Sequence, residues 1–174
     1  MHDISKIDKN FVVKTKIEKD DIKFHTIDEA PFKVYGVFRE KDRYRRMPED
    51  VAKTVSYGVY GLHANTAGGR ARFITDSPYI AIHAEMDNVG KMPHFPLTGS
   101  AGFDLYVDNI YTKTFVPPFC IENGYESVCE FKSKEIREIT IKFPLYFDVK
   151  ECLLWMLWVM IMAVQPVYVL QKLK

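Results

Sequence analysis

The stretch GSAGFDLYVD, Gly99–Asp108, decides the fold of this chain. It opens with two glycines and a serine, which allow the backbone to turn sharply. Apolar and polar residues then alternate with a period of two, which indicates a β-strand with one buried face. The apolar side consists of Phe103, Leu105 and Val107. The opposite side consists of Asp104, Tyr106 and Asp108, so this strand presents carboxylates and an aromatic ring to its outer surface.

Working outward, similar short segments recur along the chain with turn residues between them. We expect strands at 32–40, 70–75, 79–86, 111–116, 125–131 and 136–143, and one or two edge strands within 1–30. Gly36, in the middle of the first of these, predicts a bulge or a close backbone contact. Asp108–Asn109 and Asn123–Gly124 are both hairpin signals. This spacing of short strands predicts an all-β sandwich.

One short helix is expected in the sequence MPEDVAKTVSYG, residues 47–58. Pro48 is tolerated in a first helical turn, and the acidic pair that follows it suits the positive end of a helix. Val51 and Val55 lie four residues apart on one face. We expect Gly58 and Gly61 to end the helix, and residues 59–69 to form a strand followed by a tight turn.

Two motifs together resemble a known family. The sequence MPHFPLTGSAGFDLYVD, residues 92–108, read with GGRARFITDSPYIAIHAEM, residues 68–86, resembles the GxDLY amino-terminal domain of SGNH (GDSL-type) esterases. The resemblance runs from about Phe32 to Phe147. It implies a jelly-roll-like β-sandwich accessory domain over residues 1–149 that is normally followed by an α/β hydrolase domain.

The function implied by the resemblance is non-catalytic. We expect an accessory domain that docks on an SGNH hydrolase domain, or shapes substrate access to it, with that hydrolase domain missing from this chain. The mechanism of such esterases needs a serine nucleophile, an Asp-x-x-His block and oxyanion donors. The only Asp-Ser pair is Asp76–Ser77, where Pro78 prevents the strand-to-helix turn that exposes a nucleophile, so we interpret Ser77 as a turn residue. The last histidine is His94, so no late Asp-x-x-His block exists.

The outward residues of the organising strand are the candidate ligand site. We predict that Arg72, Asp104, Tyr106 and Asp108 bind substrate, with hydroxyl groups held by the carboxylates and a sugar ring stacked on the tyrosine. Arg70 and Arg72 are expected to pair with Asp104. The structural alternative is an Arg–Asp pair that only joins two strands. The alternative function is therefore a free-standing, lectin-like carbohydrate-binding module, whose partner would be a carbohydrate or an acylated sugar.

The sequence contains only weak indications of a metal or cofactor site. The five histidines show no metal-binding spacing, although His83, Glu85 and Asp87 share a strand face and are a possible calcium cluster. The three cysteines form no CxxC motif and do not suggest a disulfide framework. We therefore expect no metal and no cofactor. The basic cluster Arg43–Arg46 is either an anion site or a solvated loop with Tyr44 buried.

Composition limits the partners. The formal net charge is +1, which gives no general attraction to nucleic acid or to an anionic membrane. The amino terminus lacks the basic-then-apolar pattern of a secretory signal, so the default expectation is a cytoplasmic location unless a signal was removed.

The carboxyl-terminal residues 150–174 are expected to form an apolar tail that departs from the family pattern. Thirteen apolar residues run from Cys152 to Val164 before Gln165–Pro166. The tail has three interpretations: an altered gene end, one or two buried strands, or a membrane anchor. The membrane anchor is the least favoured, because thirteen residues fall short of the roughly twenty that span a bilayer.

Overall fold

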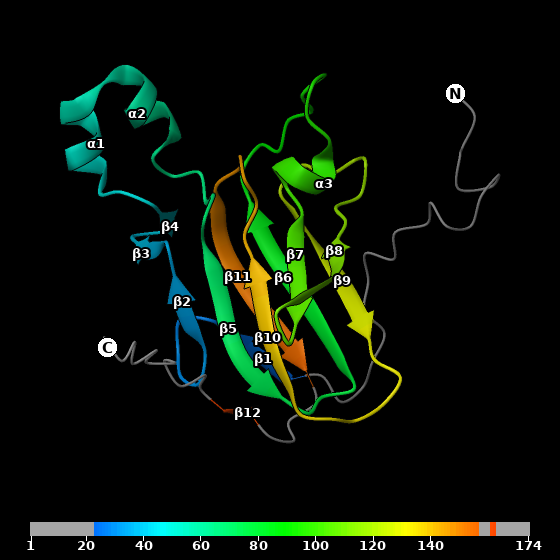
Figure 1. Ribbon diagram of the computed structural model, residues 1–174. Coiled ribbons are helices and arrows are strands. Elements are labelled where there is room, and N and C mark those ends of the chain that lie inside the picture. The colour runs from blue at the N-terminus through cyan, green and yellow to red at the C-terminus, as the bar shows by residue number, and fades with distance from the viewer. Residues whose placement is uncertain (1–22, 157–160, 163–174) are drawn as a thin grey trace, which may run out of the picture.

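A computed structural model describes residues 23–156 and the backbone of residues 161–162. The described strands form two antiparallel sheets that face each other and a small separate hairpin (Figure 1). The all-β sandwich expected from the sequence is therefore confirmed. The predicted segment Phe11–Val13 lies outside the described residues.

The first sheet has four strands in the order β1-β11-β6-β9. Their bounds are β1 Lys23–Thr26, β11 Val149–Met156, β6 Tyr79–Met86 and β9 Gly124–Glu130. The edge position of β1 confirms the edge strand expected before residue 30. The second sheet has the order β12-β5-β10-β7-β8, and β2 also pairs with β5. Its bounds are β12 Ile161–Met162, β5 Arg70–Thr75, β10 Arg137–Lys142, β7 Phe103–Val107, β8 Ile110–Phe115 and β2 Lys33–Tyr35.

The core lies between the two sheets. Phe103 and Leu105 of β7 are fully buried, together with Ile139 and Ile141 of β10, as the alternating pattern predicted. The facing sheet contributes fully buried side chains that include Ile80, Ile82 and Leu154. Each such side chain stabilises the fold by about 1.5–3 kcal/mol through burial.

The hairpin expected at Asp108–Asn109 is confirmed. Both residues have positive φ, 49° and 66°, which is the backbone of a tight two-residue hairpin turn, and they join the paired strands β7 and β8. The second hairpin signal was wrong. Asn123–Gly124 does not connect two neighbouring strands, because β9 pairs with β6, far earlier in the chain, and the Met86 amide donates to the Asn123 carbonyl.

The strand expected over residues 32–40 is interrupted at Gly36. The chain leaves the large sheet there and enters the hairpin of β3 (Phe38–Glu40) and β4 (Arg43–Arg45). Gly36 has a φ of +77°, and a Cβ at this position would collide with the carbonyl oxygen of Gly68. The close backbone contact predicted for Gly36 is therefore confirmed, but it breaks the strand into β2 and β3.

The expectation of a single helix was wrong. The described residues contain three short helices: α1 (Glu49–Val55), α2 (Tyr57–Leu62) and α3 (Leu97–Ser100). Ser56 separates the first two, since its side chain accepts a hydrogen bond from the Val59 amide and caps α2. This cap allows Gly58 and Gly61 to lie inside a helix, where their low propensity alone had suggested a helix end followed by a strand.

The expected boundary at Val149 is not a structural boundary. β11 crosses it and is an interior strand that pairs with both β1 and β6. Cys152, Leu154 and Met156 are buried in the core. Of the three interpretations of the tail, the buried strand therefore describes residues 150–156. Within the part of the chain that the structure describes, no helix is long and apolar enough to span a bilayer.

Candidate binding groove on the outer face of the large sheet

The outward side chains of the six-stranded sheet form two rows across neighbouring strands. Because the side chains at alternate positions are buried, those between them face outward. Strand register places the members of each row directly opposite one another. The first row is Tyr35–Arg70–Lys142–Asp104–Thr114, and the second is Lys33–Arg72–Thr140–Tyr106–Tyr111.

A hollow of about 270 Å³ lies between the two rows. We call it the basic groove; it is lined by Arg70, Arg72, Tyr106, Asn109, Thr140 and Lys142. Two of the four predicted site residues, Arg72 and Tyr106, therefore meet in one groove. Arg70 was noticed in the sequence only as a partner for Asp104. The outward alternation of β10 was the signal that could have added Thr140 and Lys142.

The predicted pairing of Arg72 with Asp104 was wrong. Arg72 forms an ion pair with Glu138 of β10. Strand β10 lies between β5 and β7 and Asp104 belongs to the other row, so Asp104 is more than two strand spacings, about 9.6 Å, from Arg72. Glu138 is a diagonal neighbour on the adjacent strand, and diagonal neighbours lie within reach of long side chains. The order of strands, which the sequence does not show, determined the partner.

Asp104 and Asp108 are both used within the fold. Asp104 accepts a 2.6 Å hydrogen bond from the Thr114 hydroxyl on β8. Asp108 lies in the hairpin turn, where its carboxylate accepts a 2.9 Å hydrogen bond from the Glu138 amide. Neither residue lines the basic groove.

Aromatic rings support the cations of the groove. The Lys142 ammonium lies 4.2 Å from the centre of the Tyr106 ring, and the Arg70 guanidinium lies 5.2 Å from that of Tyr35. Tyr106 also packs edge-on against Tyr111, with ring centres 5.7 Å apart. Cation–π contacts of this kind hold charged groups at a partly exposed surface without neutralising them.

Ser77 has no access to substrate. It is fully buried, and its hydroxyl donates a hydrogen bond to the Tyr79 carbonyl. The hydroxyl also accepts a hydrogen bond from the Tyr79 amide. Ser77 therefore stabilises the turn between β5 and β6, as the sequence predicted.

The residues of the possible calcium cluster, His83, Glu85 and Asp87, do not converge on one point but contact different partners. His83 contacts Glu126 at 3.0 Å and Glu85 at 3.7 Å. Asp87 instead binds Lys150 at 2.7 Å and Arg43 at 3.5 Å, so cations already neutralise it. Over residues 23–156, no group of three or more His, Cys, Asp or Glu side chains is placed to hold a metal ion.

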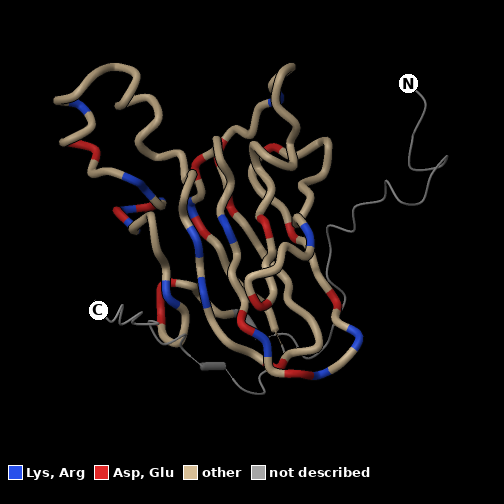
Figure 2. Tube along the Cα trace, in the orientation of Figure 1, with Lys and Arg blue, Asp and Glu red and all other residues tan. Residues whose placement is uncertain are grey.

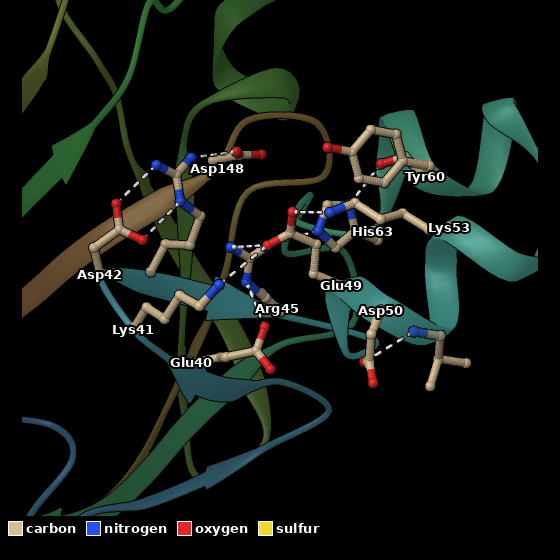
Figure 3. A network of polar contacts seen from close by, with 12 residues as sticks. Glu40, Lys41, Asp42, Arg45, Glu49, Asp50, Lys53, Tyr60, His63 and Asp148 are labelled. Carbon is tan, nitrogen blue, oxygen red and sulfur yellow. Dashed lines mark hydrogen bonds and ion pairs between the residues drawn. The ribbon is translucent and has the colours of Figure 1, made fainter.

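The basic cluster on β4 is not a solvated loop. Arg43 pairs with Asp42 and Asp148, both at 2.9 Å, and the hydrogen bond from Arg43 lowers the pKa of Asp42 to about 2 (Figure 3). Tyr44 is buried, as expected, and donates a 2.7 Å hydrogen bond to Asp28. Burial and this hydrogen bond raise the pKa of Tyr44. Arg43, which was a candidate for binding an anion, is therefore already paired with carboxylates of the chain itself.

Arg45 is the most buried arginine of this cluster, with 6% of its surface exposed. It pairs with Glu40 at 3.0 Å and with Glu49 of α1 at 3.5 Å, and it contacts His63 (Figure 3). A guanidinium only donates hydrogen bonds, so Nε2 of His63 accepts and Nδ1 carries the proton that it donates to the Tyr60 carbonyl. Arg45 thus joins the β3–β4 hairpin to both ends of the helical segment.

The described residues form an all-β sandwich domain with a small hollow of about 270 Å³ on one outer face. Comparison with protein families matches residues 22–154 to the GxDLY family, described as the N-terminus of SGNH hydrolase-type esterases. The match covers most of the chain, so this protein belongs to the GxDLY family. No protein of curated function matches the chain significantly.

Two solved structures share the fold. One is from Bacteroides ovatus and is described as a GDSL-like lipase; it has a TM-score of 0.72 and 21% identity, over 83% of this chain and 43% of the other. The second is a salicylyl-acyltransferase from a tetracycline biosynthetic pathway; it has a TM-score of 0.63 and 18% identity, over 85% of this chain and 43% of the other. This chain therefore matches less than half the length of these two proteins.

Proposed function

We propose that this domain is a non-catalytic accessory domain that packs against an SGNH hydrolase domain and helps to shape substrate access. The family match to the N-terminal part of such esterases carries the proposal. The matched structures support it, since more than half of each lies outside the region shared with this chain. The buried Ser77, which has no access to substrate, also favours a non-catalytic role.

A helical segment, residues 46–65, is the surface that we expect the hydrolase domain to contact. It projects away from the two sheets (Figure 1). Its exposed apolar side chains are Val51, Val55, Tyr57, Tyr60 and Leu62, and Tyr57 is 91% exposed. A hollow of about 330 Å³ beside them is lined mostly by apolar or uncharged groups of α2 and Met47. Apolar surface gathered on one projection is typical of protein interaction sites.

The base of this segment is firmly attached. The Arg46 amide donates a 3.0 Å hydrogen bond to the His63 carbonyl, and the Arg46 side chain donates a 2.6 Å hydrogen bond to the Leu62 carbonyl. Arg45 adds the contacts to Glu49 and His63. The two ends of the segment are therefore held together, so the apolar side chains are presented in a defined position, which lowers the entropic cost of docking.

The test measures binding of the chain to the SGNH hydrolase domain encoded in the same genome. We expect the double substitution Tyr57→Ser with Leu62→Ser to weaken binding at least about tenfold, because buried aromatic anchors dominate interfaces. The control is Phe119→Ser with Ile136→Ser, which removes two other exposed apolar side chains outside the helical segment. Equal effects of both pairs, or no binding by the parent chain, would contradict docking through this segment.

A second assay addresses catalysis. The isolated chain should not hydrolyse p-nitrophenyl acetate. Turnover that a single substitution in this chain abolishes would show that the domain is itself catalytic.

The second candidate function is carbohydrate binding through the basic groove. The observation that favours it is a tyrosine ring beside hydroxyl and amide groups in one hollow, since Tyr106, Thr140 and Asn109 all line it. A glycan array with the parent chain and Tyr106→Ala tests it. Loss of a saccharide signal in the variant is the expected result, and the absence of any saccharide signal from the parent chain would remove this function.

A further inference from the structure

Two cations of the basic groove, Arg70 and Lys142, differ from the other arginines of the described residues. Five of those arginines form ion pairs: Arg39, Arg43, Arg45, Arg72 and Arg137. Arg46 donates to a backbone carbonyl. The Arg70 guanidinium has neither an ion pair nor a hydrogen bond within residues 23–156, and it contacts the Tyr35 ring.

Lys142 lies directly opposite Arg70 in the register of β5 and β10. It also has no carboxylate within ion-pair distance among the described residues, and its ammonium rests on the Tyr106 ring. Asp104 is its neighbour on β7, but that carboxylate accepts its hydrogen bond from Thr114 on the other side. Two like charges directly opposite on a sheet repel each other, so this arrangement costs stability in the absence of an anion.

The outer face of the large sheet as a whole also carries more positive than negative charges. Its two rows hold four cationic side chains, Lys33, Arg70, Arg72 and Lys142, and one carboxylate, Asp104. The other nearby carboxylate, Glu138, is already paired with Arg72. The chain as a whole carries a formal net charge of only +1, so this positive field is local to the groove.

We propose that the basic groove binds a carboxylate-bearing saccharide. Arg70 and Lys142 hold the carboxylate, with the planar guanidinium able to bind both of its oxygens. The Tyr106 ring offers an apolar surface to the sugar ring, and Thr140 and Asn109 offer hydrogen bonds to hydroxyl groups. The hollow of about 270 Å³ is slightly smaller than typical ligand pockets of roughly 300–1,000 Å³, which fits one or two sugar residues of a longer chain.

This inference rests on the second candidate function, saccharide binding, and is independent of docking to a hydrolase domain. It differs from saccharide binding in general because it requires the ligand to carry a negative charge. A matched pair of probes separates the two: trigalacturonic acid and its methyl ester, which share the same sugar chain but carry charged carboxylates in one case and neutral methyl ester groups in the other.

The experiment is calorimetric titration of the 174-residue chain with each probe. We expect the acid to bind at least about tenfold more tightly than the methyl ester, and its affinity to fall as salt is added. Arg70→Gln and Lys142→Gln should each weaken binding of the acid about tenfold and leave any binding of the ester unchanged. Lys132→Gln removes the same charge from an exposed position away from the groove and should have no effect.

Each other result overturns a distinct part of the idea. Equal affinity for acid and ester would retain saccharide binding and reject the carboxylate requirement. No binding of either probe would reject both. A sulfated trisaccharide that binds more tightly than the acid, or an equal loss in Lys132→Gln, would show unspecific charge attraction. Thermal unfolding of each variant confirms that it is folded.

Discussion

The two outer faces of the sandwich carry charges of opposite sign. The outer face of the large sheet carries Lys33, Arg70, Arg72 and Lys142, and Figure 2 shows cationic positions on the neighbouring strands β5 and β10. The outer face of the small sheet, which we call the acidic face, carries Glu85, Glu126 and Glu151 around His83. Its hollow, of about 830 Å³, is the larger of the two.

The comparison separates what burial requires from what it leaves free. Both inner faces must be apolar, because they form one shared core. The charged side chains on the two outer faces are at least partly exposed, so packing of the core does not fix their charges. On each face like charges lie opposite each other, Arg70 with Lys142 and Glu85 with Glu151. Such pairs do not stabilise the sandwich, so binding of a ligand or a partner explains these like-charge pairs better than folding stability does.

The largest expected contrast lies between a cysteine on the acidic face and two in the interior. Cys120 is exposed beside the hollow of the acidic face, whereas Cys129 and Cys152 are buried. Burial raises the pKa of both buried thiols, which suppresses their reactive thiolate forms. One thiol per chain should react quickly with DTNB near pH 8. The other two should react only when the protein opens. Their reaction rates should therefore be lower by a factor that corresponds, at most, to the full free energy of unfolding.

Rapid reaction of all three thiols in the native protein would contradict this burial. Once confirmed, a fluorescent label on Cys120 reports on the acidic face alone. Addition of trigalacturonic acid should leave its signal unchanged if the ligand occupies the opposite face.

Removing a core side chain should damage both faces together. Phe103→Ala deletes a fully buried ring between the sheets, and we expect it to lower the free energy of unfolding by about 3–5 kcal/mol. Urea denaturation measures the change. A loss below about 1 kcal/mol would mean that β7 is not packed between the sheets as described.

Gly36→Ala should damage the basic side alone. The residue has positive φ, and an added Cβ meets the Gly68 carbonyl, so we expect a loss of about 2 kcal/mol and displacement of Tyr35 from Arg70. Gly90→Ala is the matched control, because a Cβ there has open space apart from ordinary contact with Phe147. Equal stability of the two variants by urea denaturation would contradict the close approach at Gly36.

Glu138→Gln should have the smallest effect on stability. The Arg72–Glu138 pair is partly exposed, so its loss should cost less than about 1 kcal/mol. The same substitution removes the carboxylate partner of Arg72 and makes the basic face more positive. Stability by urea denaturation should therefore change little while affinity for trigalacturonic acid rises, and a fall in that affinity would contradict the charge argument.

Local patterns predicted local features well. The alternation of Phe103 with Asp104 identified a strand and its inner face, and Asp108–Asn109 identified the hairpin, because neighbouring residues alone decide these conformations. Ser77 was likewise recognised as a turn residue from the adjacent Pro78. The second helix was missed because Gly58 and Gly61 were interpreted as the end of the first helix and the Ser56 cap was not considered. Residues 150–156 were assigned to the tail because residues 152–156 of β11 are apolar on both faces and show no alternation.

The sequence by itself determined the alternating strands, the hairpin at Asp108–Asn109 and the family to which the chain belongs. Only the tertiary structure decided which strands are neighbours. That order gave Arg72 its partner Glu138 instead of Asp104, placed Lys142 opposite Arg70 and moved residues 150–156 into the small sheet. The physical reason is that side-chain periodicity is a property of each strand, whereas pairing depends on contacts between segments far apart in the chain.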